Sequence, residues 1–178
     1  MNRISLTIVL SFFSSIVSAQ LAVAPRVSPV AISIAAYKTT YLKIVYGQPS
    51  KKGREIFGKL VPYGEVWRTG ANEATEITIT RDVIVNGKTL KAGTYALFTI
   101  PGKDRWTIIF NNDIGSWGAY NYNMKADELR VEVPAETLTD AAYESFTILI
   151  VPKNEKADIS LVWDKTKVTL PIQFNEPK

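Results

Sequence analysis

The sequence contains no cysteine and no histidine. Without cysteine, disulfide bonds, thiolate metal sites, cysteine nucleophiles and a lipid anchor attached through cysteine are all excluded. Without histidine, serine-histidine-aspartate triads and imidazole zinc sites are excluded as well. Any catalysis would have to use carboxylates, lysines, tyrosines or hydroxyl groups, so an enzymatic activity is not the leading expectation.

Motifs for metals and cofactors are also scarce. Three oxygen-bearing side chains stand in a row at Asn111, Asn112 and Asp113. They lack the ordered spacing of a calcium loop, and such residues after a strand are typical of a turn. The glycines have neither the spacing nor the strand-to-helix context of a phosphate-binding loop. The sequence therefore predicts no bound metal and no cofactor.

The charge is low and dispersed. The chain has 21 basic and 17 acidic residues, a formal net charge of +4. Nucleic-acid binding usually requires a concentrated basic stripe. The densest basic cluster, Lys51, Lys52, Arg54 and Lys59, places only four charges in nine residues. We interpret this cluster as a solvated loop and expect no nucleic-acid partner.

One long hydrophobic run occurs, at residues 4–17, directly after Arg3. Several serines dilute it, and Val17 and Ala19 stand three places and one place before the expected cleavage position. This pattern predicts a helical signal peptide over residues 1–19, because a membrane-spanning helix needs about 20 apolar residues. We expect a periplasmic or secreted protein with no stable membrane insertion after cleavage.

The remainder predicts one domain. Removing 19 of 178 residues leaves 159, an ordinary domain length. The net charge falls from +4 to +3, because the signal peptide contains Arg3 and no acidic residue. We expect an N-terminal lead-in with a candidate first strand over residues 20–36, and a single domain over residues 37–175.

Short alternating segments predict strands throughout this domain. In residues 41–46, Leu42, Ile44 and Tyr46 share one face, and Asn86-Gly87 predicts a tight hairpin turn. Strands about every ten residues, without long helical patterns, predict an all-β, antiparallel β-sandwich or jelly-roll-like domain. The further predicted strands are residues 76–81, 94–100, 105–110, 129–133, 145–151, 159–163 and 167–172.

The most unusual stretch is residues 60–75. It contains five candidate ligand-binding residues, Tyr63, Trp67, Arg68, Asn72 and Glu73. Polar groups beside aromatic surface are the composition of a small-molecule or sugar pocket, and an arginine fork binds carboxylates well. The same residues also fit a structural role, in which the aromatic residues belong to the core or its rim and Arg68 forms a buried pair with Glu73.

A second polar and aromatic stretch follows residue 110. Trp117, Tyr120 and Tyr122 occur within six residues, and we add Trp117 and Tyr120 to the ligand-binding candidates, because exposed rings stack on sugars or peptides. A loop folded over an open edge of the sandwich would use the same residues as a plug.

Several ordered blocks of sequence resemble the domain-of-unknown-function family 2911. The resemblance covers most of the chain and implies an exported β-rich protein of Gram-negative bacteria. It implies no reaction and supplies no catalytic residues. The blocks are YGQPS at 46–50, KGR at 52–54, IFG at 56–58, residues 60–75, DV at 82–83, NG at 86–87, AGTY at 92–95, FTIP at 98–101, Trp106, IFN at 109–111 and WG at 117–118.

Three functions remain open. The leading hypothesis is a periplasmic or secreted module that binds a glycan or an acidic small molecule. The alternative is a hydrolase of glycosidic bonds, with two carboxylates drawn from Glu65, Glu73 and Asp113. A third is a structural or assembly role in the envelope, in which an exposed strand edge or the tryptophan loop docks a protein partner.

Overall fold

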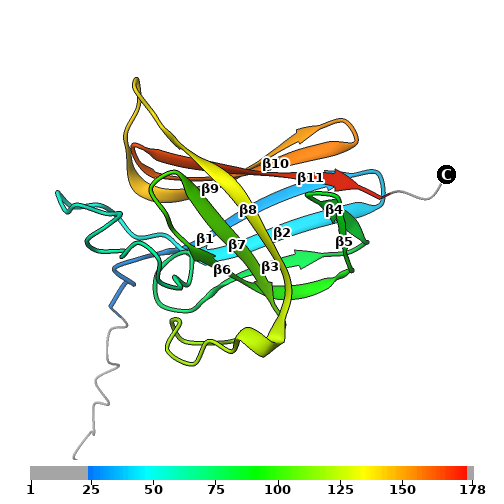
Figure 1. Cartoon of the computed structure of the whole chain (residues 1–178), viewed down its shortest axis with the longest axis horizontal. Coiled ribbons are helices and arrows are strands. Elements are labelled where there is room, and N and C mark those ends of the chain that lie inside the picture. The colour runs from blue at the N-terminus through cyan, green and yellow to red at the C-terminus, as the bar shows by residue number, and fades with distance from the viewer. Residues whose placement is uncertain (1–23, 176–178) are drawn as a thin grey trace, which may run out of the picture.

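The computed structural model describes residues 24–175 and shows an all-β domain (Figure 1). The predicted signal peptide lies outside the described residues. A single turn of 3-10 helix, η1 (Met124–Ala126), accompanies the strands. The strands are β1 (Val30–Tyr37), β2 (Thr40–Gly47), β3 (Thr75–Ile79), β4 (Val83–Val85), β5 (Lys88–Leu90), β6 (Gly93–Ile100), β7 (Arg105–Asn111), β8 (Asp127–Thr137), β9 (Tyr143–Lys153), β10 (Lys156–Asp164) and β11 (Thr166–Phe174).

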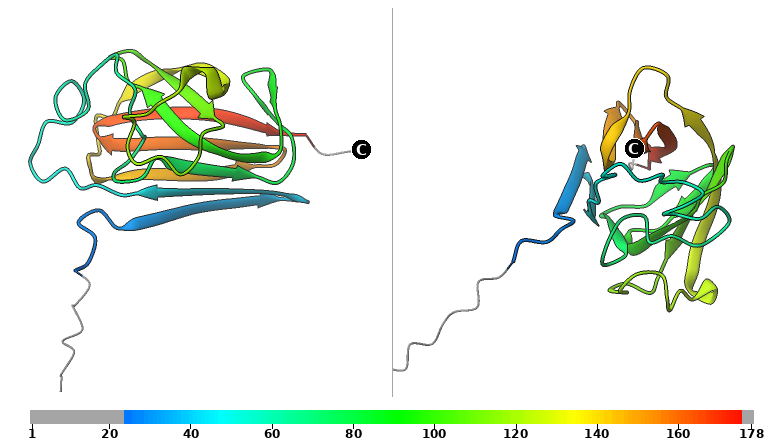
Figure 2. Two further views of the ribbon diagram at one scale, coloured as in Figure 1. Left: turned by 90° about the horizontal axis from the view of Figure 1, so that it is seen from below. Right: turned by 90° about the vertical axis from the view of Figure 1, so that its left-hand side faces the viewer.

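The strands form one antiparallel sheet that folds back on itself and is nearly closed. Its order is β1-β2-β3-β6-β7-β8-β11-β10-β9, and the β4-β5 hairpin extends it through β4 beside β11. Strand β8 joins the two layers, because its first part pairs with β7 and its last part, from Ala135 to Thr137, pairs with β11. The layers face each other across the core (Figure 2), which confirms the predicted all-β antiparallel class.

The alternation seen in the sequence determines which side chains fill the space between the layers. Leu42 and Ile44 of β2 are fully buried and Tyr46 is 4% exposed, so the predicted inward face is confirmed. Ile77 and Ile79 of β3 point into the same core. Burying a side chain of this size contributes about 1.5–3 kcal/mol. The main described core cluster draws on both layers, and a smaller cluster gathers around Phe98 and Ile109.

The predicted hairpin turn is confirmed. Asn86 and Gly87 both adopt positive φ, 48° and 76°, as the two-residue turn between β4 and β5 requires. Val85 stands opposite Lys88 across this turn.

The sheet does not close completely between β1 and β9. These edge strands lie side by side without a strand ladder between them, and side chains from β1 and from the neighbouring β2 reach across to β9. Tyr46 Oη accepts a hydrogen bond from the backbone N–H of Ile148 at 3.1 Å, and Ser33 Oγ donates one to its carbonyl. Beyond the end of β2, Ser50 and Ser145 form an isolated antiparallel bridge that continues the closure. We call the β1–β9 boundary the seam.

Strand β1 turns its larger apolar side chains outward. Val30, Ile32 and Ile34 are 50–62% exposed, whereas Ala35 is buried. Because the strand pairs with β2 along its whole length, residues 30–37 belong to the sheet. Among the described residues, no helix is long and apolar enough to cross a membrane.

Candidate functional site

The two stretches singled out in the sequence lie against each other. The backbone N–H of Ala74 donates to the carbonyl of Ser116 at 2.9 Å, and that of Gly118 donates to Asn72 at 3.0 Å. Glu73 and Trp117 form an isolated antiparallel bridge between them. Residues about 45 positions apart therefore form one loop cluster, in which the end of the long β2–β3 crossover meets the segment after β7 (Figure 1).

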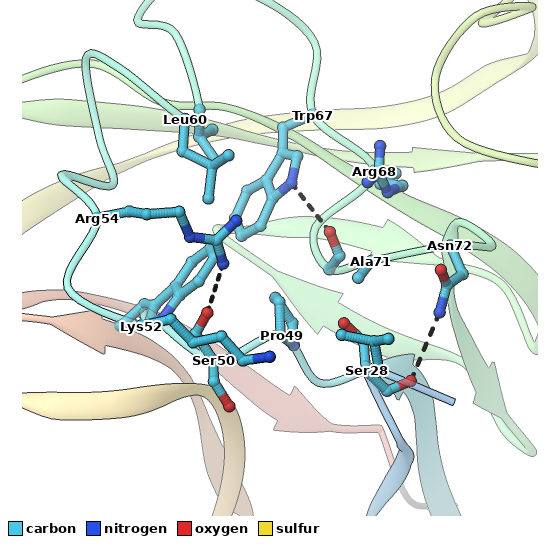
Figure 3. A pocket seen from close by; sticks show the side chains of 14 residues that line it. Ser28, Pro49, Ser50, Lys52, Arg54, Leu60, Trp67, Arg68, Ala71 and Asn72 are labelled. Atoms are coloured by element: carbon cyan, nitrogen blue, oxygen red, sulfur yellow. Dashed lines mark hydrogen bonds between the residues drawn. The ribbon is translucent and has the colours of Figure 1, made fainter. Parts of the chain in front are cut away.

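A cavity of about 530 Å³ opens at this end of the sheet, and we call it the basic cavity. Its size lies within the usual range for small-molecule sites. Its walls come from the segment before β1, from the β2–β3 crossover and from β10 (Figure 3). The lining residues are Val27, Ser28, Pro49, Ser50, Lys52, Arg54, Leu60, Val61, Trp67, Arg68, Gly70, Ala71, Asn72 and Trp163.

Aromatic residues form the inner wall of the basic cavity. Trp67 is only 8% exposed and stacks on Trp163, with ring centroids 6.0 Å apart and an interplanar angle of 17°. It also packs edge-on against Phe146, Phe57 and Trp106. Trp67 Nε1 donates to the carbonyl of Gly70 at 3.1 Å. Trp67 is therefore a residue of the core that also lines the cavity, as both the structural and the ligand-binding interpretation of residues 60–75 would allow.

Three cationic side chains line the basic cavity, and its lining contains no carboxylate. Lys52 and Arg54 extend from one side, and Arg68 lies on the other (Figure 3). Arg54 donates to the carbonyl oxygens of Lys51 at 2.9 Å and Ser50 at 2.6 Å, which fixes its guanidinium without neutralising its charge. The cavity is thus a site of positive potential.

Arg68 differs from the other two cationic side chains in its burial. It is half-buried, and its Nε atom is buried without a hydrogen-bond partner among the described residues. Leaving such a donor unpaired costs about 1–3 kcal/mol. The alternative expectation of a buried Arg68–Glu73 pair was wrong, because Glu73 is exposed and forms its ion pair with Arg26.

The backbone that follows Arg68 is held in an uncommon conformation at two positions. Thr69 has φ 55° and Asn72 has φ 64°, and a β-branched residue in this region is a genuine outlier. Thr69 is fully buried; its Oγ1 donates to Thr99 Oγ1 at 3.2 Å, and its carbonyl accepts from Thr75 Oγ1 at 2.6 Å. Strain held in this way by surrounding bonds is often found at binding sites.

The segment before β1 lines one part of the basic cavity with Val27 and Ser28. Asn72 Nδ2 donates to the carbonyl of Ser28 at 3.5 Å, and Arg26 pairs with Glu73. A hydrogen bond from the backbone N–H of Glu73 itself, and then the Arg26 guanidinium, lower the pKa of the Glu73 carboxyl. Glu73 lines a separate cavity of about 240 Å³ together with Arg26.

A third cavity, the side cavity, adjoins the basic cavity. It measures about 310 Å³ and shares four residues with its neighbour, Leu60, Val61, Trp67 and Arg68. Its other lining residues are Pro62, Glu65, Val66, Ala119 and Tyr120. Arg68 therefore stands between a cavity of positive charge and one that holds a carboxylate.

The predicted aromatic candidates have different positions. Tyr120 is 85% exposed and lines the side cavity. Trp117 is 63% exposed and Tyr63 is 40% exposed, and neither lines the basic or the side cavity. Of the seven candidates, the structure brings Trp67, Arg68 and Asn72 to the basic cavity and Tyr120 to the side cavity.

Tyr122 points inward and fastens its loop. Its ring packs on Phe98 with centroids 5.1 Å apart, and its hydroxyl donates to Asp127 at 2.6 Å. Arg130 pairs with the same carboxylate at 2.6 Å. Burial, and then the hydrogen bond to Asp127, raise the pKa of Tyr122 to about 12.

The sequence interpretation missed Lys52 and Arg54 as site residues. Both are exposed, in keeping with the solvated loop predicted for them, but they also line the basic cavity. Lys51 instead pairs with Asp164 at 2.7 Å. The density of basic residues in this cluster was the available signal for a cationic site. Only the path of the crossover shows that Lys52 and Arg54 line the same cavity as Arg68.

The acids considered for hydrolysis are dispersed. Glu65 lines the side cavity and Glu73 lines the cavity beside Arg26, while Asp113 is exposed. A glycosidase needs two carboxylates facing one bond. The arrangement of these three residues favours binding over hydrolysis.

The outer face of the seam is apolar. Beside Ile32 and Ile34 of β1, Leu149 and Val151 of β9 are 41% and 47% exposed. An exposed apolar face is the kind of surface that an assembly role requires, and it is separate from the cationic side chains of the basic cavity.

Fold and cavity together define an antiparallel β-sandwich whose sheet is nearly closed, with a cationic cavity at one end. The family model described as "Protein of unknown function (DUF2911)" matches residues 28–172, and the chain belongs to this family. Comparison with curated proteins gave no significant match, and neither did comparison with solved structures.

Proposed function

We propose that this domain is an exported binding module for anionic small molecules, which occupy the basic cavity. The observation that carries the proposal is a cavity lined by three cationic side chains, Lys52, Arg54 and Arg68, and by no carboxylate among the described residues. Export rests on the signal peptide predicted from residues 1–19.

The electrostatics favour an anion. Lys52, Arg54 and Arg68 repel one another across the cavity, and a bound carboxylate or phosphate relieves this repulsion. Charge-assisted bonds to a guanidinium are roughly twice as strong as neutral hydrogen bonds. The exposed parts of Lys52 and Arg54 remain open to counterions, so the affinity should fall as salt is raised.

The unpaired donor on Arg68 also favours a ligand. In the free protein, its Nε–H is removed from water and bonded to no described group. Because this nitrogen is closed to water, an acceptor reaches it only if the Arg68 side chain shifts on binding, and that hydrogen bond would then offset the cost of its burial. The strained backbone at Thr69 and the bonds that hold it keep the arginine at this position.

The test is a thermal-shift and calorimetric screen of residues 20–178 against phosphate, citrate, hexuronic acids and neutral sugars. An anion at about 100 times its dissociation constant adds about 2.7 kcal/mol of stability, which raises the melting temperature by several degrees in a domain of this size. We expect such a shift for anions, and none for neutral sugars of the same size.

The decisive variant is Arg68→Met. It should abolish the anion shift and raise the unfolding free energy of the free protein by about 1–3 kcal/mol, because it removes an unpaired buried donor. The matched control is Arg130→Met. Arg130 is paired with Asp127, so its loss should destabilise the domain by about 1–3 kcal/mol while the anion shift remains. Absence of any anion shift, with Arg68→Met destabilised, would identify Arg68 as a structural residue.

A further inference from the structure

We infer that the ligand is an acidic glycan of at least two sugars, with the carboxylate of a uronic acid in the basic cavity and a neutral neighbouring sugar in the side cavity. This inference rests on the proposed function and extends it from a charge preference to a substrate class. Its basis is the contact between two cavities of different chemistry.

The two cavities are adjacent. Leu60, Val61, Trp67 and Arg68 line both of them. These residues form the common boundary of the two cavities, and in our inference a ligand longer than one ring crosses this boundary beside Arg68. With volumes of about 530 Å³ and 310 Å³, the pair is suited to a ligand with two parts.

The side cavity differs from the basic cavity in charge. Glu65 lines it, whereas no carboxylate lines the basic cavity. A second acidic group placed here would meet the Glu65 carboxylate and be repelled. Sugar hydroxyl groups, in contrast, donate hydrogen bonds to a carboxylate, so the part of the ligand in this cavity should be neutral and hydroxylated.

Tyr120 provides a flat surface for that sugar. The residue is 85% exposed, which leaves much of its aromatic surface in water. The ring lies over Gly118, where a Cβ would come within 2.8 Å of Tyr120 Cε2, so the glycine lets the ring settle close to the backbone. A ring positioned in this way, beside a hydrogen-bond acceptor, combines the aromatic surface and the polar group typical of a sugar site.

The test is titration calorimetry with three probes: glucuronic acid, the disaccharide glucuronosyl-(1→4)-glucose, and neutral cellobiose. In the wild-type protein we expect the acidic disaccharide to bind about tenfold more tightly than glucuronic acid, the gain of one ring stacked on an aromatic side chain. Cellobiose should bind more weakly than either acid, because it lacks the carboxylate.

Two exposed tyrosines make a matched pair of variants. Tyr120→Ala should reduce the advantage of the disaccharide to less than about twofold and leave the affinity for glucuronic acid unchanged. Tyr63→Ala, which removes an exposed ring outside both cavities, should leave both affinities unchanged. Circular dichroism melting curves establish that each variant is folded.

The outcomes separate the two proposals. Suppose that anions bind through Arg68 but the disaccharide binds no more tightly than glucuronic acid. The glycan inference is then overturned and the anion site stands. The same holds if the disaccharide does bind more tightly but keeps this advantage in Tyr120→Ala. Binding of cellobiose as tight as that of the acidic disaccharide would also overturn it. If no anion binds at all, the proposed function itself is lost.

Discussion

Gly47 shows how closely the crossover approaches the sheet. The backbone N–H of Ala71 donates to the carbonyl of Gly47 at 3.1 Å, and a Cβ on Gly47 would lie 2.1 Å from the carbonyl oxygen of Ala71. This contact joins the end of β2 to the wall of the basic cavity. No side chain fits between the two backbones.

Gly47→Ala should therefore destabilise the domain and displace the Arg68 segment. The overlap is with backbone, which cannot rotate away, so we expect a loss of about 1–3 kcal/mol of unfolding free energy. Urea denaturation measures it. The control is Gly93→Ala, where the nearest atom is the side-chain hydroxyl of Tyr95 at 3.3 Å. Equal effects from the two substitutions would show that the Gly47 contact is not tight.

At this scale the sequence predicted residue types better than partners. The grouping of Trp67, Arg68 and Asn72 was visible because polar and aromatic residues are unusually dense in residues 60–75. The partner of Glu73 could not be predicted from the sequence, because Arg26 lies 47 residues away and no local pattern connects the two residues. An ion pair distant in sequence depends on the path of the chain.

At the scale of the elements, the seam is bridged by side-chain hydrogen bonds, because no strand ladder joins β1 to β9. The N–H and carbonyl of Ile148 are bonded to Tyr46 and Ser33 side chains, where a paired strand would use backbone groups. Each of these contacts depends on one hydroxyl group.

Tyr46→Phe should weaken the seam without disturbing the core. The phenyl ring keeps its edge-on contact with Phe146, at 5.7 Å between centroids, but the buried N–H of Ile148 loses its acceptor. We expect a loss of about 1–3 kcal/mol and faster hydrogen exchange at Ile148, measured by NMR. If exchange at Ile148 is unchanged while the stability falls, the hydroxyl does not hold the seam.

The strands were predictable because period-two alternation is a local property. Segments such as residues 94–100 and 105–110 coincide closely with β6 and β7. Strand β1 was the harder case. Its small residues Ala31, Ser33 and Ala35 point inward while Ile32 and Ile34 point outward, so a pattern that assigns large apolar residues to the core gives the opposite face.

For the whole molecule, the Tyr122 cluster links stability to alkaline pH. The pKa of Tyr122 is raised to about 12 in the folded protein, against an ordinary value of 10.0. The unfolded chain therefore releases this proton first. The stability associated with the protonated phenol is complete below pH 10 and is lost as the pH rises toward 12.

Tyr122→Phe should remove this part of the pH dependence. Urea unfolding of both proteins at several pH values from 9 to 11.5 measures it, and the wild type should lose stability more steeply above pH 10. Other tyrosines, including Tyr95, whose pKa burial also raises, contribute equally to both proteins. Parallel curves would show that Tyr122 titrates alike in the folded and unfolded chains.

The seam joins two segments that the ribosome synthesises at different times. Tyr46 and Ile148 are 102 residues apart, so the ribosome completes the β1–β2 hairpin long before the strand that it must meet. At about 5–20 residues per second, the first hairpin waits on the order of 5–20 s for β9. During that interval the inner face of β1 and its free edge are without their final neighbours, so a chaperone that covers residues 30–47 would protect the waiting hairpin.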